Sequence, residues 1–437
     1  MSLDFLILYE HIVREYESIT LLKAELERRG YTAEIRQLLD RKKLKYFTYK
    51  KPKVLVASAM YDDKTMNSFV YNNVGVCNKV VNLHWEQVLS EEQENSPFFN
   101  CGGAAAYATH TCWGKAAQNR LIKYGVPADN TVITGPIQMD FLRDQFEGYY
   151  KSKARLCKEF GLDPEKKMAL YISSFSTAYM NDREIKQLNE LAGVGFDNFK
   201  LTSRKTMNTT LDWVDKFLST PEGENIEFIY RRHPSEWNSP ILNEMAAKHK
   251  NFHLISDYSV KRWIKAADVI FSWISTSIAE IYFARKSCFV VRPYPVEWEY
   301  DPVVYKDCRH IDNYRDFAAS FSAENPPFPI DTALMEWHYD FTDTPSYIRM
   351  ADVLERVLKE DEGDRKPFDH FKPSFSWLKF FSLIGLHAMY AIRLDPGKMK
   401  MFGGLSEWAG RIYGHIKNTR VSKQQREEYM RNVKRFM

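Results

Sequence analysis

A short stretch just past the middle of the chain joins a strand-like pattern to a cluster of cationic side chains. Residues 228–237 read FIYRRHPSEW, and the first three of them suit a half-buried β-strand. Pro234 has no amide proton to give to a sheet ladder, so the strand must stop at or before it. Arg231, Arg232 and His233 are therefore expected at the end of a strand, which is where ligands bind in open α/β sheets.

A hydroxyl-rich segment follows a later strand pattern at Val269 to Ser272. Its members are Ser275, Thr276 and Ser277. They are suited to cap the helix predicted from Ile278 to Ala284, and such a helix start binds anions through its free N–H groups. With Arg232 and His233 beside it, the segment would hold a phosphate or pyrophosphate. Glu280, about one turn into the helix, could accept hydrogen bonds from a ribose diol.

Each of these motifs has a plainer interpretation on its own. A Ser/Thr-rich helix start is often only a cap, and an arginine after a strand is usually solvated. Their order along the chain is more informative: strand, Arg-His-Pro, strand, hydroxyl-rich helix start, glutamate, strand. This order favours a nucleotide site in the second half of the chain.

The first half has its own titratable cluster directly after the strand predicted at Leu3 to Tyr9. Glu10 and Arg14 are four residues apart, as are His11 and Glu15, so each pair would share a helix face and could form a surface salt bridge. The cluster also lies at a strand end, facing the presumed cleft. A carboxylate there, Glu10 or Glu15, could act as general base for an acceptor hydroxyl.

Other polar residues follow further predicted strands and would line the same cleft. Together with Arg14, they are Glu86, Asp140, Ser173 and Ser174.

The elements that must position these residues alternate between strand and helix. A first series of strand patterns runs from Leu3 to Thr134, and a second begins near Met168 and runs to Arg292. Alternation of this kind implies βα units and parallel sheets. We expect an α/β protein with two Rossmann-like αβα domains that face a cleft. Residues 1–150 would form the acceptor domain and residues 151–345 the nucleotide-sugar domain. A helical region would follow at residues 346–437.

The composition is that of an ordinary globular protein. The chain has 437 residues, of which 44% are hydrophobic and 27% charged, enough for two domains with substantial cores. No secretory signal is visible at the N-terminus. Six cysteines are scattered without CxxC pairing, which indicates reduced thiols in a cytoplasmic protein and suggests neither a zinc site nor a disulfide framework.

The C-terminal region differs from the rest in charge and hydropathy. From Pro396 onward there are ten Lys/Arg and three Glu, a net charge of +7, against +4 for the whole chain. Before it, residues 375–392 are strongly apolar but carry Lys379 and His387, so they fit an interfacial amphipathic helix better than a membrane span. A helix that packs back on the first domain is an equally good interpretation of the same pattern.

Taken together, the motifs resemble bacterial surface-carbohydrate biosynthesis proteins of the glycosyltransferase-B type. The similarity rests on the opening Glu10, Arg14 and Glu15, on LHWE ending at Glu86, on ITGPIQMD, on RRHPSEW, and on WIKAADVIFSWISTSIAE. The second half is also similar to CDP-glycerol glycerophosphotransferases and to sialyl- and Kdo-transferases. The resemblance implies that His233 and the hydroxyl-rich segment hold the donor phosphate, that Glu280 binds hydroxyls, and that Glu10 or Glu15 is the base.

The expected function is transfer of a sugar from a nucleotide donor, most simply a CMP-linked acidic sugar such as Kdo, to a glycan or lipid-linked acceptor. No DxD motif stands at a strand end, so we expect no metal and no other cofactor. The basic tail predicts attachment to the anionic inner face of the cytoplasmic membrane and no nucleic-acid partner. Alternatives are an alditol-phosphate transferase, a sugar-nucleotide epimerase, and a non-catalytic scaffold of a polysaccharide assembly complex.

Overall fold

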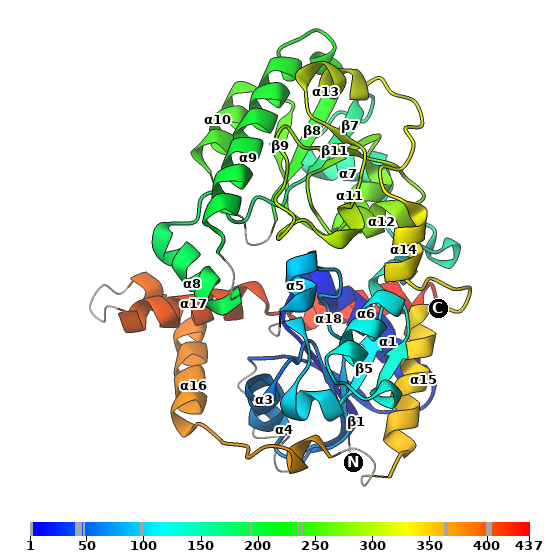
Figure 1. Ribbon diagram of the computed structural model, residues 1–437, viewed down its shortest axis with the longest axis vertical. Helices are drawn as coiled ribbons and strands as arrows, with labels where there is room; N and C mark the ends of the chain where they lie inside the picture. The colour runs from blue at the N-terminus through cyan, green and yellow to red at the C-terminus, as the bar shows by residue number, and fades with distance from the viewer. Residues whose placement is uncertain are drawn as a thin grey trace. The chain divides into compact units, whose positions relative to one another are not determined.

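The computed structural model describes residues 3–39, 46, 49–96, 99–192, 195–233, 236, 239–361, 366–398 and 404–437. The chain divides into two compact units (Figure 1). Unit 1 comprises residues 1–87, 100–140 and 339–437, and unit 2 comprises residues 88–99 and 141–338. The chain passes between the units after residues 87, 99, 140 and 338.

Unit 1 is built on a six-stranded parallel sheet with the order β2-β1-β3-β4-β5-β6. The strands are β1 (Leu3–Tyr9), β2 (Ala33–Gln37), β3 (Pro52–Ala57), β4 (Val80–Asn82), β5 (Thr109–Cys112) and β6 (Thr131–Ile133). Leu55 and Val56 on the central strand β3 are both fully buried, on opposite faces of the pleat. Burial on both faces explains why residues 54–57 of β3, VLVA, are a continuous apolar run.

Helices connect the strands of unit 1. They are η1 (Ile12–Tyr16), α1 (Glu17–Arg28), α3 (Asp63–Thr65), η2 (Met66–Tyr71), α4 (Asn72–Val74), η4 (Gly103–Tyr107), α6 (Lys115–Lys123), η5 (Ala128–Asn130) and η6 (Ile137–Leu142). The helix predicted from Ile12 to Arg29 is confirmed, but its first turn, η1, is a π-helix.

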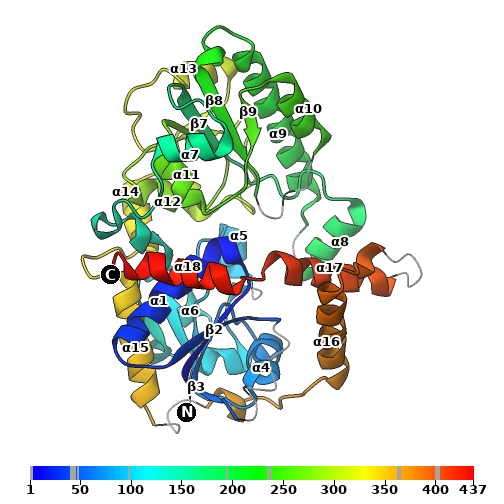
Figure 2. The ribbon, with the colours of Figure 1, turned by 180° about the vertical axis from the view of Figure 1, so that it is seen from behind.

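The C-terminal helices belong to unit 1 and do not form a compact unit of their own. They are α15 (Ser346–Lys359), η10 (Pro367–Asp369), α16 (Trp377–Ala391), η11 (Pro396–Lys398), α17 (Gly404–Asn418) and α18 (Lys423–Lys434). Figure 2 shows α18 crossing in front of α1, where the rings of Tyr16 and Tyr429 lie 5.3 Å apart. The Tyr9 hydroxyl, at the end of β1, donates to the Thr419 carbonyl at 2.8 Å.

Unit 2 has a second six-stranded parallel sheet, with the order β12-β11-β10-β7-β8-β9. Its strands are β7 (Lys167–Ile172), β8 (Ile226–Arg231), β9 (Phe252–Leu254), β10 (Val269–Ser272), β11 (Phe289–Val291) and β12 (His310–Ile311). Strand β7 is central, with β8 on one side and β10 on the other. The carboxyl ends of the strands that carry the predicted donor site are therefore neighbours.

The helices of unit 2 cover both faces of its sheet; Figures 1 and 2 show α9 on one face and α7 on the other. They are α5 (Glu91–Asn95), η7 (Asp144–Phe146), α7 (Lys153–Phe160), α8 (Asp182–Ala192), α9 (Asp197–Leu218), η8 (Gly223–Asn225), α10 (Pro240–Lys248), α11 (Val260–Ala266), α12 (Ile278–Phe283), η9 (Val303–Tyr305), α13 (Tyr314–Ser320) and α14 (Thr332–His338).

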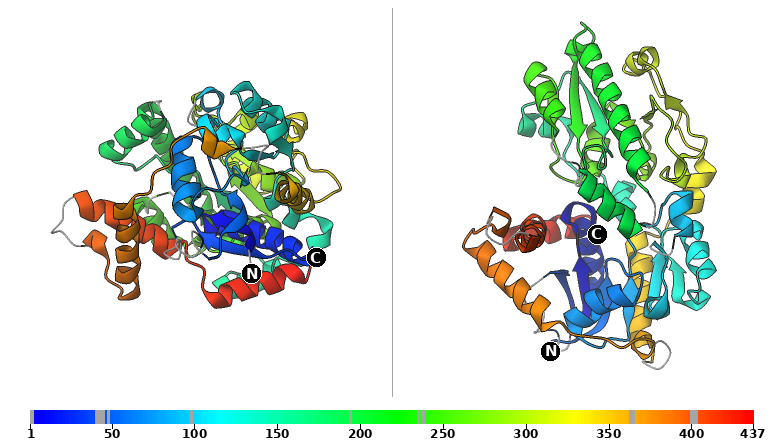
Figure 3. Two further views of the ribbon diagram at one scale, coloured as in Figure 1. Left: turned by 90° about the horizontal axis from the view of Figure 1, so that it is seen from below. Right: turned by 60° about the vertical axis from the view of Figure 1, so that its left-hand side comes forward.

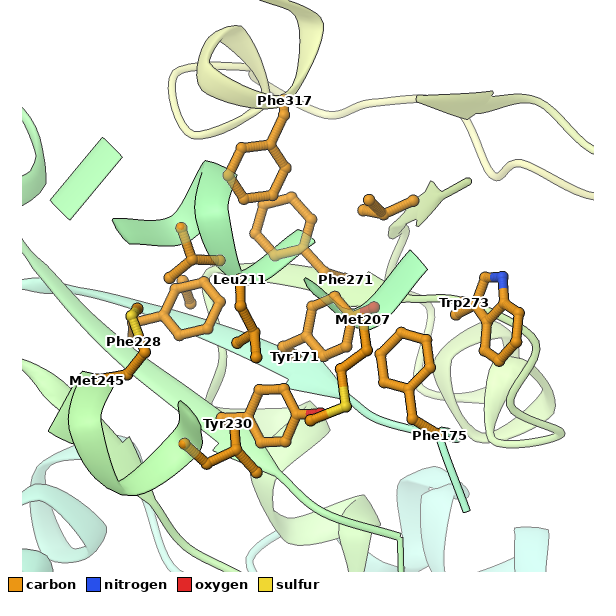
Figure 4. Close-up of a cluster of buried hydrophobic side chains, with 14 of the residues drawn as sticks. Tyr171, Phe175, Met207, Leu211, Phe228, Tyr230, Met245, Phe271, Trp273 and Phe317 are labelled. Atoms are coloured by element: carbon orange, nitrogen blue, oxygen red, sulfur yellow. The ribbon is translucent and has the colours of Figure 1, made fainter. Parts of the chain in front are cut away.

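An aromatic core fixes the sheet of unit 2 against α9 (Figure 4). The Tyr171 ring on β7 stacks on the Tyr230 ring on β8 at 5.4 Å, and Phe271 on β10 lies 5.2 Å from Phe317 on α13. Met207 and Leu211 on α9 close the cluster, and both are buried. These contacts make the ends of β7, β8 and β10 a rigid platform for the loops that follow them.

The strands at Leu3–Tyr9 and Val269–Ser272 have the predicted bounds. The strands predicted at 31–35, 53–57, 80–83, 131–134, 226–230, 252–255 and 288–292 agree with β2, β3, β4, β6, β8, β9 and β11 within two residues at each end. Two strands, β5 and β12, were not predicted. Within the described residues, no helix is both long enough and apolar enough to span a membrane.

Candidate functional site

Three neighbouring strand ends in unit 2 bring predicted site residues together. Ser173, the first residue after β7, donates its backbone N–H to the Arg231 carbonyl at the end of β8, at 3.0 Å. Ser174, next in the chain, accepts a 3.4 Å hydrogen bond from the Ile274 backbone N–H, two residues beyond β10. The segments after β7, β8 and β10 are thus joined at one edge of the sheet.

The two arginines at the end of β8 have different roles. Arg231 is buried, and its guanidinium donates to the carbonyls of Asp257 and Tyr258, the first at 2.9 Å. Burial lowers the pKa of Arg231 to about 10. Tyr258 adopts a φ of 65°, which a non-glycine residue rarely takes, so Arg231 stabilises a strained loop.

Arg232 and His233 follow Arg231 directly. Arg232 is half-buried, with its Nε buried, and His233 is exposed. Pro234, the third residue of the motif, lies outside the described residues.

Glu236 is a buried residue of this loop that the sequence analysis did not select. Its carboxylate accepts from the Tyr230 hydroxyl at 2.9 Å and from the Ser173 hydroxyl. The backbone N–H groups of His233 and Phe175 also bond to it. Burial raises the pKa of Glu236 and these hydrogen bonds lower it, with burial the larger effect. The carboxylate anchors the His233 loop to the end of β7; the only sequence signal was an acidic residue three positions after the histidine.

The hydroxyl-rich segment leads into α12, but it differs from an open helix start. The helix has only six residues, so its dipole is small. The Ser277 N–H donates to the Ser275 hydroxyl at 3.3 Å, and the Ile278 and Ala279 N–H groups bond to the Ser275 and Thr276 carbonyls. These amides are engaged within the turn, unlike the free N–H groups expected from the sequence.

The side chains of this segment remain available for recognition. Thr276 is exposed, and Ser275 and Ser277 are half-buried. The Tyr305 hydroxyl holds the Ser275 carbonyl at 2.6 Å. Glu280 follows on α12, where desolvation raises the pKa of its carboxyl and the charge of Lys261 works the other way.

A pocket of about 360 Å³ opens beyond the end of β11 in unit 2. It is lined by Thr202, Lys205, Tyr294, Pro295, Val296 and Glu297. Arg292, next to β11, is held away from it by a bidentate ion pair with Asp301, at 2.6 and 2.8 Å. The pocket was not predicted, because α9 contributes half of its polar lining from a distant part of the chain.

The predicted catalytic cluster of unit 1 is organised around Glu15. Glu15 is fully buried on η1, and its carboxylate accepts from the Glu10 backbone N–H at 2.8 Å and from the Arg14 guanidinium at 3.1 Å. Arg14 also pairs with Glu86 at 2.8 Å. Burial raises the pKa of Glu15, with Arg14 working against that shift. The helix starts at Ile12, and the ion pairs of this cluster join Arg14 to Glu15 and to Glu86.

His11 and Asp140 have local partners within unit 1. The His11 ring lies 5.9 Å from the His415 ring of α17 in an edge-to-face arrangement. Asp140 is buried, and its carboxylate accepts from the backbone N–H groups of Ser346 and Tyr347 at 3.0 and 2.7 Å. Asp140 therefore caps α15, a structural use that differs from the expected place in a cleft. Nearby Gly135 has a φ of 75°, and a Cβ there would lie 2.3 Å from the Asp340 carbonyl oxygen.

Comparison with solved structures identifies the fold. The chain is similar to a variant of the wall teichoic acid polymerase TagF in a crystal soaked with CDPG, with a TM-score of 0.52 and 11% identity over 82% of this chain and 89% of that one. It is also similar to the Methanocaldococcus jannaschii UDP-GlcNAc 2-epimerase in complex with UDP-GlcNAc and UDP, with a TM-score of 0.50 and 12% identity over 82% of this chain and all of that one. The expected fold class is thereby confirmed: two αβα units of the GT-B type.

No family model matches the chain, and no curated protein matches it in sequence. At identities of this size the likeness concerns the fold alone.

Proposed function

We propose that the protein is a glycosyltransferase of bacterial surface-polysaccharide synthesis that binds its nucleotide-sugar donor on unit 2. The observation that carries this proposal is the meeting of the segments after β7, β8 and β10, which presents Arg232, His233 and the hydroxyls of Ser275 and Thr276 from one edge of a parallel sheet. In open α/β sheets this edge is the usual ligand site.

The donor we favour is a CMP-linked acidic sugar such as Kdo. Arg232 and His233 would hold the phosphate through charge-assisted hydrogen bonds, and the Ser275 and Thr276 hydroxyls would complete its shell. Glu280 would bind ribose or sugar hydroxyls. Positive charge from Arg232 and His233 would offset the charge that develops on the leaving group, so we expect no added metal to be required for transfer.

The acceptor would be a glycan or a lipid-linked glycan, deprotonated by Glu10 of unit 1. Glu10 is half-buried at the end of β1, whereas both carboxylate oxygens of the fully buried Glu15 are already hydrogen-bonded. Glu15 would act as a positioning residue, because it holds the Glu10 backbone and Arg14. Substituting Glu10 should then lower turnover and leave donor affinity unchanged.

Helix α16 supports attachment to a membrane surface. Its buried residues Leu383 and Leu386 pack against Tyr413 of α17, where Figure 3 shows the two helices side by side. Trp377, Leu378 and Phe381 are 59%, 79% and 61% exposed, and their spacing places them on one side of the helix. An apolar face beside a basic tail suits the anionic inner leaflet of the cytoplasmic membrane.

A second candidate is an alditol-phosphate transferase that uses a CDP-alditol, which the likeness to the CDPG-soaked polymerase favours. A sugar-nucleotide epimerase is a third, favoured by the likeness to the UDP-GlcNAc 2-epimerase. An epimerase acting on a soluble nucleotide would need neither an acceptor nor the exposed face of α16. A scaffold would bind no nucleotide.

The test is a thermal-shift panel of CMP, CDP, UDP, GDP and UMP on the full-length protein. A ligand at 100 times its dissociation constant adds about 2.7 kcal/mol to the unfolding free energy. The proposal predicts that CMP stabilises most. A preference for CDP would favour alditol-phosphate transfer, a preference for UDP or GDP would reject the CMP donor, and no response to any nucleotide would favour the scaffold.

A further inference from the structure

Three potential metal ligands converge in the interior of unit 1. His84 follows β4, Cys101 precedes η4, and His110 lies on β5. One ligand atom from each lies within 4.8 Å of the other two. All three residues are at most 1% exposed. Among the described residues this is the one His/Cys/Asp/Glu group with such an arrangement.

The orientation of His110 is that of a metal ligand. Its Nε2 lies 2.9 Å from the Ala105 carbonyl oxygen, so Nε2 carries the proton and donates it to that oxygen. Nδ1 is then the acceptor nitrogen: the Asn82 amide N–H donates to it at 3.2 Å, and the Cys101 Sγ lies 3.6 Å from it. Metal-bound histidines typically donate their second N–H to a backbone carbonyl in this way. Two ligands of a tetrahedral zinc ion are roughly 3.4 to 3.6 Å apart, given Zn–N and Zn–S bonds of about 2.1 and 2.3 Å.

His84 supplies an independent observation. Neither of its ring nitrogens has a hydrogen-bond partner among the described residues, although the residue is only 1% exposed. Burying an unsatisfied polar group costs on the order of 1–3 kcal/mol. Its backbone also adopts a φ of 50°, an uncommon conformation outside glycine. A bound cation would satisfy a ring nitrogen and would explain why the chain holds this conformation.

We propose that His84, Cys101 and His110 bind a zinc ion. Imidazole and thiolate together suit zinc, and they do not suit magnesium or calcium. The Asn82 amide nitrogen, which donates to His110 Nδ1 at 3.2 Å, would give up this hydrogen bond to the ion, while the Asn82 amide oxygen keeps the His84 backbone N–H at 3.2 Å. Binding releases the Cys101 proton to solvent, and the thiolate cancels one of the two charges of the ion. Burial raises the pKa of the Cys101 thiol, and the charge of nearby Arg120 works against that rise.

The consequence of the ion would be to fix the turn that carries Glu86. Through His84, zinc would hold the segment that follows β4. Through His110 and Cys101, it would connect that segment to β5 and to the residues before η4. Glu86 bonds Arg14, which bonds Glu15. The zinc would therefore be structural, and it would hold the acidic cluster of unit 1 in place.

The experiment measures metal on the full-length protein. Protein purified without chelators is analysed for zinc by mass spectrometry, and metal-free protein is titrated with Co²⁺. We expect one zinc per chain, and for cobalt a thiolate charge-transfer band with tetrahedral d–d absorption. Cys101→Ser and His84→Gln should each weaken cobalt binding at least tenfold. Cys77→Ser, at another buried cysteine of unit 1, should bind as the parent does.

Two results would overturn the proposal. The first is that wild-type protein holds no stoichiometric metal after incubation with excess zinc and gives no thiolate–cobalt charge-transfer band. This result does not require any variant to fold. The second is unchanged cobalt spectra in folded Cys101→Ser and His84→Gln proteins. Stoichiometric copper with little zinc would reject zinc in particular.

Discussion

The Glu236 carboxylate accepts a 2.9 Å hydrogen bond from the Tyr230 hydroxyl, and this pair ties the loop that carries His233 to the sheet of unit 2. Both side chains are buried, and the Ser173 hydroxyl bonds the same carboxylate. A buried acceptor with several donors is costly to remove, because each donor is left unsatisfied. The loop therefore depends on a residue that we do not expect to touch the donor.

Glu236→Ala should lower the unfolding free energy of the protein by roughly 3–5 kcal/mol, as expected when a buried hydrogen-bonded charge is removed. Glu236→Gln should be milder but should still weaken nucleotide binding, because the His233 loop loses an acceptor. Urea denaturation and nucleotide titration measure the two effects. Glu244→Gln, at an exposed position on α10, is the control. Unchanged affinity in folded Glu236→Gln would show that the loop is held by other contacts.

The platform beneath the donor site depends on aromatic packing. Phe271 is fully buried among Phe228, Phe317 and Phe321. Phe271→Ala should destabilise the protein by about 3–5 kcal/mol through lost burial and the cavity left behind. Leu201→Ala, at a residue that is 54% exposed on α9, should change stability by less than about 0.5 kcal/mol. Equal effects in denaturant titrations would contradict this description of the core.

Acidification should destabilise the protein through His415. Burial lowers the pKa of His415 below its ordinary value of 6.5, with Glu10 working the other way. The unfolded chain then binds the proton more readily than the native chain does. The stabilisation that comes from neutral His415 in the native state is therefore complete above pH 6.5, and it is lost as the pH falls from 6.5 to the folded pKa of His415. His415→Gln should flatten the pH dependence of the unfolding free energy across that window. An unchanged slope would show that groups other than His415 cause the pH dependence of the unfolding free energy.

The exposed face of α16 should bind anionic vesicles. A Trp377→Ser/Phe381→Ser variant should lose most of its co-sedimentation with vesicles that contain phosphatidylserine, while Trp298→Ser, at a residue that is 57% exposed in unit 2, should bind normally. Because the basic tail contributes electrostatically, binding should also weaken as salt rises. Equal binding by both variants would show that α16 is not the membrane contact.

Much of the fold could be predicted from local sequence. Apolar runs such as Leu3–Tyr9 and Val269–Ser272 are strands buried on both faces, and their hydropathy alone identifies them. Strand β5 was missed because its sequence, THTC, is polar, although all four residues are buried. It is stabilised by its neighbours in the sheet and not by its own hydropathy.

The site could be predicted only in part. His233 and the hydroxyl-rich segment could be placed because each follows a predicted strand. Since strands that alternate with helices run parallel, the ends of these strands lie at the same edge of the sheet. Arg231 was placed correctly at a strand end, but its contact with Tyr258 was not predicted. That contact, the role of Glu236 and the cluster of His84 with Cys101 and His110 depend on distant segments of the chain. No spacing rule for zinc covers three ligands scattered over residues 84–110.

The most direct test of the central claim is a calorimetric titration of CMP into wild-type, His233→Ala and His310→Ala proteins. His310 is an exposed histidine on the edge strand β12 of unit 2, so its removal controls for lost charge. We predict that His233→Ala weakens CMP binding at least tenfold, about 1.4 kcal/mol, and that His310→Ala binds like the wild type. CMP binding that is unaffected by His233→Ala, or absent from the wild type, would contradict the assignment of the donor site.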